Sequence, residues 1–151
     1  MSAAESDLPV DQRLCLALYQ ASHAMDATYR VLLGDSGLTY PQYTVLSVLR
    51  QDGAAPVTVV ARRLGLSSNT VSPLLKRMEG RGWITRRRSG EDERAVIVDL
   101  TAEGRRLGDE VGDVPRRVTD AAGLSDAQQT DLVGTLHQLA AALRAGPAQE
   151  A

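Results

Sequence analysis

The sequence predicts a mainly α-helical fold with one small β-ribbon, and residues 57–100 carry most of this prediction. The helical pattern of apolar residues at the start of this segment ends at Gly65, and Ser67 then supplies the cap of a second helix. Two apolar runs follow, starting near Gly82 and Ala95, and turn-forming residues separate them. Helix, turn, helix and β-ribbon, in this order, are the layout of a winged helix-turn-helix.

Two further helical regions flank this segment, at about 8–36 and 101–146. In the first, apolar residues recur at helical spacing, and Pro9 is suited to the first turn, so we expect Cys15 in the second turn. In the second, Pro115 predicts a bend or break, and a capping box opens a final helix. That final helix carries one apolar stripe, formed by Leu132, Leu136, Leu139 and Leu143.

We expect the whole chain, 1–151, to form one domain in which residues of about 37–100 bind DNA. The flanking helices are more apolar than a winged helix of this size needs, so their stripes require a partner. In a two-fold homodimer, the flanking regions of the second subunit would be that partner. Such a dimer also presents two recognition helices to a pseudo-palindromic site on double-stranded DNA. The alternative is that the flanking helices fold back onto their own winged domain.

The charge distribution supports DNA binding. Between Ala61 and Arg94 there are nine basic and four acidic residues, a net charge of +5, whereas the whole chain carries −2. Everything outside this window therefore sums to −7. A basic module within an acidic protein concentrates the attraction for phosphate on one surface, although arginine clusters are also found on solvated helix faces.

The residues expected to contact DNA lie on the second helix of the pair and on the ribbon. The first turn of the helix places side chains near base edges and backbone N–H groups near phosphate, and Lys76 lies two turns on. On the ribbon, Arg94 is placed to enter the minor groove while Asp92 steadies it. The predicted DNA-binding residues are Ser67, Ser68, Asn69, Thr70, Ser72, Lys76, Arg77, Arg86, Asp92 and Arg94.

Composition restricts the remaining classes of function. No apolar run approaches the roughly 20 residues that span a membrane, so no membrane partner is expected. The single cysteine excludes an intrachain disulfide and fits a reducing cytoplasm, which is the expected location. His23 and His137 are isolated in the sequence, so we expect no metal site and no cofactor.

The one cysteine, Cys15, lies near an unusual concentration of phenols, because all four tyrosines fall within residues 19–43. Tyr19 is one helical turn after Cys15, but Tyr29 is about 20 Å away along the same helix. The thiol can meet that phenol only if the first helix of a second subunit runs antiparallel beside it. A buried structural role for the cysteine remains the alternative, since cysteine often acts as a small hydrophobe.

Four segments carry a resemblance to a known family: RLCLALY at 13–19, GLTYPQY at 37–43, PLLKRME at 73–79 and EDER at 91–94. They resemble the organic-hydroperoxide-sensing branch of the MarR family, called OhrR, over about residues 14–104. The last two segments are shared by the whole MarR family. Cys15 together with the segment from Leu38 to Tyr43 is specific to the branch.

The resemblance implies a homodimeric repressor whose N-terminal cysteine reacts with organic hydroperoxides and whose oxidation releases the operator. Cys15 matches the sensing cysteine, Tyr29 and Tyr40 match phenols that hydrogen-bond it across the dimer, and Tyr19 lies close by. The chain has no second cysteine and so resembles the one-cysteine type. Its sulfenic acid would react with a low-molecular-weight thiol, cyclise with a backbone nitrogen or over-oxidise.

Two other functions fit parts of the sequence. A MarR-type regulator could answer to a small phenolic or carboxylate ligand, with Cys15 structural, and a Cys15→Ser variant would then still respond. A thiol peroxidase is the more distant alternative, because no second thiol completes a catalytic cycle and Arg13 is the only nearby cation. A sensor consumes about one peroxide per thiol, whereas an enzyme continues when a reductant is added; we expect no enzyme.

Overall fold

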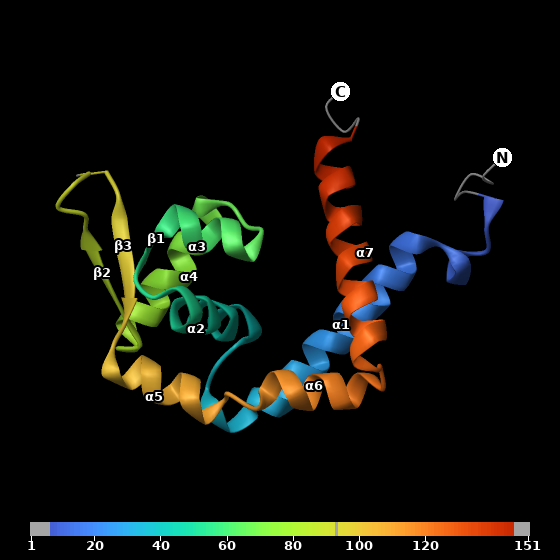
Figure 1. The fold of residues 1–151 in the computed structure, drawn as a ribbon, viewed down its shortest axis with the longest axis horizontal. Coiled ribbons are helices and arrows are strands. Elements are labelled where there is room, and N and C mark those ends of the chain that lie inside the picture. Colours follow the sequence, from blue (N-terminus) through green and yellow to red (C-terminus); the bar gives the residue numbers. More distant parts are fainter. Residues whose placement is uncertain (1–6, 93, 147–151) are drawn as a thin grey trace. The chain divides into compact units, whose positions relative to one another are not determined.

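The computed structural model describes residues 7–92 and 94–146, which form helices and one small antiparallel sheet (Figure 1). The chain divides into two compact units, Met1–Val114 and Pro115–Ala151. The first unit contains the helix-turn-helix, the sheet and the first long helix. None of the helices in the described part of the chain is both long and apolar enough to cross a membrane. The mainly helical winged fold predicted from the sequence is confirmed.

The first long helix, α1, spans Leu14–Leu33, and it begins later than the sequence analysis expected. Pro9 caps a separate 3-10 turn at Val10–Gln12, and Arg13 then adopts an extended backbone that interrupts the helix. The Arg13 side chain donates from Nε to a backbone carbonyl five residues earlier, at 3.1 Å. The expectation for Cys15 is therefore wrong: it is the second residue of α1 and lies in its first turn.

The second helix, α2, spans Tyr40–Asp52 and starts at a complete capping box. The Thr39 hydroxyl accepts from the backbone N–H of Gln42, and the Gln42 side chain accepts from the backbone N–H of Thr39. A left-handed glycine, Gly37 at φ 78°, makes the turn between α1 and α2. This turn places the phenols of both helices within one unit.

The helix-turn-helix consists of α3, Val57–Leu64, and α4, Ser68–Gly80. Gly65 adopts φ 69°, a left-handed conformation that ends α3 and allows the tight turn. The buried side of α4 presents Val71, Leu74, Leu75 and Met78 to the interior. This spacing of three and four residues forms an apolar stripe along one side of the helix.

The sheet has three strands in the order β1–β3–β2: β1 is Ala55–Pro56, β2 is Ile84–Arg88 and β3 is Val96–Leu100. Strands β2 and β3 form the wing, with Ile84 opposite Leu100 and Arg88 opposite Val96. Strand β1 was not predicted from the sequence. A strand of two residues that includes proline gives no alternation to detect, and proline is tolerated on an edge strand.

Helix α5, Ala102–Glu110, packs directly on the base of the wing. The Thr101 hydroxyl donates to the carbonyl of Gly82 at 2.6 Å, and the backbone N–H of Thr101 donates to the carbonyl of Trp83 at 3.1 Å. A Cβ atom at Gly104 would collide with that same Trp83 carbonyl. Only glycine allows the approach, so α5 and the wing are held as one body.

The second unit contains most of α6, Val114–Ala122, and all of α7, Asp126–Ala145. The chain leaves the α-helical conformation before α6, which confirms the break predicted near Pro115. The predicted capping box is also present, with Ser125 and Gln128 bonded in both directions. On α7 the side chains of Leu132, Leu136 and Leu143 are exposed.

Candidate nucleic-acid interface and thiol site

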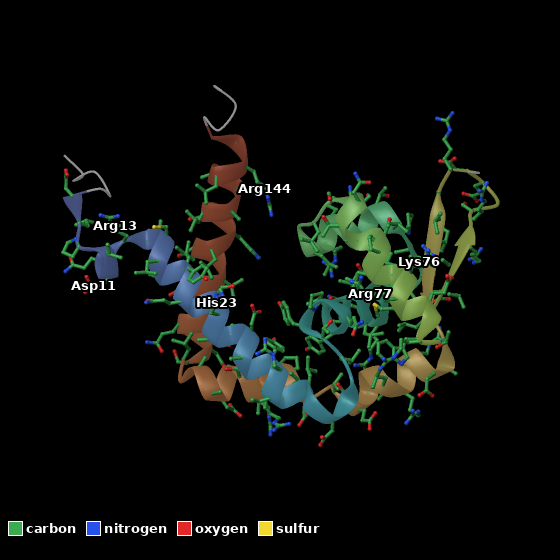
Figure 2. The ribbon with its side chains drawn as sticks, turned by 180° about the vertical axis from the view of Figure 1, so that it is seen from behind. Asp11, Arg13, His23, Lys76, Arg77 and Arg144 are labelled. Carbon is green, nitrogen blue, oxygen red and sulfur yellow. The ribbon has the colours of Figure 1, made fainter. Side chains whose placement is uncertain are left out.

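The recognition helix α4 begins at a side-chain cap. The Ser67 hydroxyl accepts from the backbone N–H of Thr70 at 3.2 Å, and the two hydroxyl oxygens lie 2.9 Å apart. These two residues therefore shape the start of the helix as predicted. Asn69 is exposed between them, and Lys76 and Arg77 are exposed further along α4 (Figure 2). One side of α4 thus carries polar and basic side chains above a buried apolar side.

The tip of the wing is organised by Asp92. Its carboxylate accepts from the backbone N–H of Arg94 at 3.0 Å, and its carbonyl accepts from the backbone N–H of Ala95 at 3.0 Å. Ser89 closes the other side, because its hydroxyl accepts from the backbone N–H of Glu91 at 3.2 Å. Asp92 was predicted to steady Arg94, and in the structure its carboxylate holds the backbone of Arg94.

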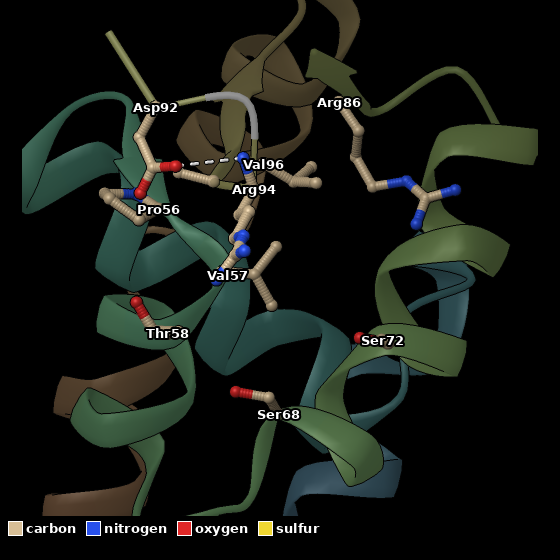
Figure 3. A pocket seen from close by; sticks show the side chains of 10 residues that line it. Pro56, Val57, Thr58, Ser68, Ser72, Arg86, Asp92, Arg94 and Val96 are labelled. Carbon is tan, nitrogen blue, oxygen red and sulfur yellow. Dashed lines mark hydrogen bonds between the residues drawn. The ribbon is translucent and has the colours of Figure 1, made fainter. Parts of the chain in front are cut away.

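A groove of about 440 Å³ separates the wing from the two helices of the helix-turn-helix (Figure 3). Thr58 of α3 lines one wall, Ser68 and Ser72 of α4 line another, and Arg94 extends from the wing. Five of the predicted DNA-binding residues therefore share one groove: Ser68, Ser72, Arg86, Asp92 and Arg94. Its hydroxyl groups and guanidinium groups are suited to hydrogen bonds with phosphate and base edges.

Arg86 is engaged within the protein. Its guanidinium lies 3.1 Å from the carboxylate of Glu79 on α4, and its backbone N–H donates to the same carboxylate at 3.1 Å. The Arg86 Nε is buried and has no hydrogen-bond partner within the described structure. Arg86 was predicted as a DNA-binding residue, and its geometry makes it first of all a link between the wing and the recognition helix.

The thiol of Cys15 is exposed in the first turn of α1. The backbone N–H groups in the first turn of a helix have no carbonyl partners within the helix. They therefore favour a negatively charged group placed near the start of the helix. Tyr19, one turn later, is 62% exposed, and its ring centroid lies 4.1 Å from that of His23. Cys15 and Tyr19 therefore share an exposed stretch of α1.

Three tyrosines form a cluster where α1 meets α2. The ring centroid of Tyr29 lies 4.6 Å from that of Tyr40 and 5.5 Å from that of Tyr43. Tyr40 is partly exposed, whereas Tyr43 is buried. Tyr43 was not among the predicted site residues. Tyr43 lies three residues after Tyr40, and residues at this spacing are neighbours on the surface of a helix. This spacing could have identified Tyr43 from the sequence.

The cluster keeps its phenols protonated. Burial raises the pKa of Tyr29 to about 12, and the neighbouring Tyr43 and Tyr40 add to the rise. Burial also raises the pKa of Tyr40, followed by the effects of Tyr43 and Asp26. At neutral pH these groups are therefore O–H donors. An anion beside them, such as a thiolate, would accept their hydrogen bonds.

One chain does not bring the thiol to the cluster. Cys15 and Tyr29 belong to the same continuous helix α1, and a rise of about 1.5 Å per residue places them about 20 Å apart. The sequence analysis reached the same distance from the helix pattern. A contact between Cys15 and this cluster requires a second copy of the chain.

Comparisons with known proteins agree with this architecture. The sequence model of the MarR family matches residues 38–96. The organic hydroperoxide resistance transcriptional regulator of Bacillus subtilis (strain 168) is 38% identical over 139 residues, which are 87% of this chain and 94% of that protein. This chain belongs to the MarR family.

A second relative is the HTH-type transcriptional regulator TtmR of Methylorubrum extorquens (strain PA1), which is 40% identical over 127 residues. The aligned part covers 84% of this chain and 65% of TtmR, so the chain spans about two thirds of that relative's length. Among solved structures, overoxidised AbfR bound to DNA matches with a TM-score of 0.69 and 33% identity, over 83% of this chain and 90% of AbfR. The resemblance to the MarR family noted in the sequence is confirmed.

Proposed function

We propose that this chain is a homodimeric, DNA-binding transcriptional repressor that senses organic hydroperoxides by oxidation of Cys15 and then releases its operator. One observation carries the proposal: the only cysteine is exposed in the first turn of α1, in a chain 38% identical to an organic hydroperoxide resistance regulator. A reduced thiol must persist between signals, which fits a cytoplasmic location.

The DNA contacts follow from the groove between the wing and α4. Asn69 and the hydroxyl groups at the start of α4 read base edges, while Lys76 and Arg77 bind phosphate. Arg94 at the wing enters the minor groove, and Asp92 holds its backbone in place. Each subunit supplies one such surface, so the operator is pseudo-palindromic double-stranded DNA.

The dimer is proposed from the apolar side chains that the described structure leaves exposed. On α1 these include Leu14 and Met25, and on α7 they include Leu132 and Leu136. Exposed apolar side chains along a helix are typical of an interface between subunits. An antiparallel arrangement of the two α1 helices would bring Cys15 of one subunit to the tyrosine cluster of the other, where Tyr29 and Tyr40 donate hydrogen bonds to sulfur.

The chemistry requires only the thiol and the peroxide. The Cys15 sulfur attacks the outer oxygen of the hydroperoxide, the O–O bond breaks, and a sulfenic acid and an alcohol form. Sulfur is oxidised by two electrons and the peroxide is reduced by two, and the proton of the thiol passes to the alkoxide. A low-molecular-weight thiol then condenses with the sulfenic acid, giving a mixed disulfide and water.

The experiment that tests this function compares wild type with Cys15→Ser. Fluorescence anisotropy of labelled operator DNA is followed while an organic hydroperoxide is added to each protein. We expect release in the wild type alone. If both proteins release, or neither does, thiol sensing is wrong, and a MarR-type regulator that responds to a small ligand becomes the better account. Continued peroxide consumption with added reductant would instead point to a thiol peroxidase.

A further inference from the structure

Arg50, near the end of α2, holds helix α5 by two contacts. Its Nη1 donates to the backbone carbonyl of Gly108 at 2.7 Å, and its Nη2 donates to the Asp109 carboxylate at 2.6 Å. The guanidinium thus binds the backbone and a side chain of the same helical turn. A planar group with several N–H donors can make both contacts at once, which an ammonium group cannot reproduce.

The surface of α5 is shaped to receive this side chain. A Cβ atom at Gly108 would collide with Cδ of Arg50 and come within 3.0 Å of its Nε. Arg50 therefore crosses the backbone of α5 at a position that only glycine leaves open. The Arg50–Asp109 ion pair is exposed and contributes little by itself. The bond to the Gly108 carbonyl and the close fit at Gly108 are the parts of the contact that both helices build.

Arg50 also connects to the tyrosine cluster along α2. Tyr43, Ser47 and Arg50 follow one another at spacings of four and three residues and so share one side of the helix. The Ser47 hydroxyl donates to the carbonyl of Tyr43 at 2.9 Å. Burial raises the pKa of the Tyr43 phenol, and the positive charge of Arg50 acts in the opposite direction.

The N-terminal end of α5 is fixed to the wing. Gly104 lies against the carbonyl of Trp83, and Thr101 bonds to the carbonyls of Gly82 and Trp83. Tyr40 and Tyr43 of the cluster and Arg50 therefore belong to the same helix, α2, and a series of contacts runs from Arg50 to α5 and on to the base of the wing. Packed helices joined by hydrogen bonds carry coupling between sites only if they have two arrangements, which an experiment must test.

We propose that Arg50 is a positioning residue that couples the tyrosine cluster to the wing by making α5 follow α2. This inference rests on the proposed function, because it assigns a route to the signal that begins at Cys15. Without the contact, oxidation still disturbs the phenols and α2, but α5 and the wing keep the arrangement that binds DNA. Arg50 touches neither the thiol nor the DNA-binding groove.

The test uses the full chain with Arg50→Lys and Asp109→Asn. For each protein, operator affinity is measured in the reduced state and after treatment with an organic hydroperoxide, and the coupling is the ratio of the two affinities. We expect reduced affinities within about three-fold of wild type and coupling ratios at least about ten-fold smaller. The double variant should lose no more coupling than Arg50→Lys alone, because Asp109→Asn acts on a contact that Arg50→Lys already disrupts.

Arg106→Lys is the matched control. Arg106 pairs with Glu103 within α5 and does not bridge to α2, so its coupling ratio should equal that of wild type. Thiol titration must show equal oxidation of Cys15 in all proteins, so that a smaller ratio reports transmission and not slower chemistry. Thermal unfolding of the reduced proteins verifies that each variant is folded.

The outcomes separate the two proposals. If wild type releases the operator and Arg50→Lys does so with the same ratio, the role of Arg50 is wrong while the proposed function stands. If reduced Arg50→Lys already binds the operator more than about ten-fold weaker, Arg50 supports the DNA-binding surface itself and the coupling role is overturned. If oxidised wild type stays bound, the proposed function fails, and with it the coupling.

Discussion

Glu79 of the recognition helix and Arg86 of the wing are joined by two contacts to one carboxylate. The Glu79 carboxylate accepts the backbone N–H of Arg86 and one nitrogen of its guanidinium, each at 3.1 Å. The hydrogen bond from the Arg86 side chain is the main cause that holds the pKa of Glu79 below its usual value. A charged pair therefore links the wing to the recognition helix, and its Arg86 lines the DNA-binding groove.

Glu79→Gln should weaken operator binding several-fold, because the amide holds the guanidinium less firmly and the wing is less well positioned. Operator affinity at neutral pH measures the effect. Glu91→Gln, which removes the same charge at the exposed wing tip, is the control. The pKa of Glu79 is depressed in the folded state. The Glu79–Arg86 pair therefore stabilises the folded state at pH values above the usual carboxylate pKa, and this stabilisation is lost as the pH falls through the depressed pKa. An affinity equal to that of Glu91→Gln would contradict the positioning role.

Arg94→Ala should weaken operator binding and reduce the dependence of binding on salt. Removal of one cation that contacts DNA lowers the slope of log affinity against log salt by about one. The measurement is operator affinity across a salt series. Arg106→Ala removes an equal charge from α5 and should leave the slope unchanged. Equal slopes for wild type and Arg94→Ala would place the wing outside the interface.

Tyr29→Phe should remove the phenol that ionises last. Burial raises the pKa of Tyr29 to about 12, so a titration of phenolate absorbance should show a step near that pH in wild type and lose it in the variant. The raised pKa means that the folded state keeps a proton that the unfolded state has lost. The protonated Tyr29 phenol therefore stabilises the folded state below about pH 10, and this stabilisation is lost as the pH rises through the pKa of Tyr29 in the folded state. A step that persists in Tyr29→Phe belongs to another tyrosine.

Gly104→Ala should destabilise the fold, because a Cβ atom there would collide with the Trp83 carbonyl. Overpacking of this kind costs about 1–3 kcal/mol. Urea unfolding followed by the fluorescence of Trp83, the only tryptophan, gives the free energy of unfolding. Gly134→Ala in α7, where a Cβ atom meets nothing within 4 Å, is the control and should be neutral or stabilising. Equal stabilities of the two variants would show that α5 can move away from the wing.

The winged helix-turn-helix could be predicted because its signals are local. Ser67, Gly65 and the apolar spacing of α4 are read within one or two helical turns, and the wing alternates around a polar tip. The start of α1 could not be predicted, since Pro9 opens a helix and a 3-10 turn equally well. Strand β1 is too short for its pattern to show.

In the candidate site, the sequence likewise predicts some residues but not the contacts between them. Cys15 and the tyrosines were found from their concentration and from a family resemblance, although their contacts across a dimer remain a proposal. The contacts that give the site its geometry were not visible in the sequence. Arg50 and Asp109 lie 59 residues apart, and no local pattern announces that they meet. The sequence likewise does not show that Glu79 of α4 meets Arg86 of β2.

The most direct test of the central claim follows thiol loss and operator release in one sample. Reduced wild-type protein bound to labelled operator receives a substoichiometric series of organic hydroperoxide, and each step is analysed by anisotropy and by mass spectrometry of the Cys15 peptide. We predict that release rises in step with oxidation of Cys15, with about one peroxide consumed per thiol. Oxidised Cys15 on protein that stays bound to the operator, or release while Cys15 is still reduced, would contradict the account.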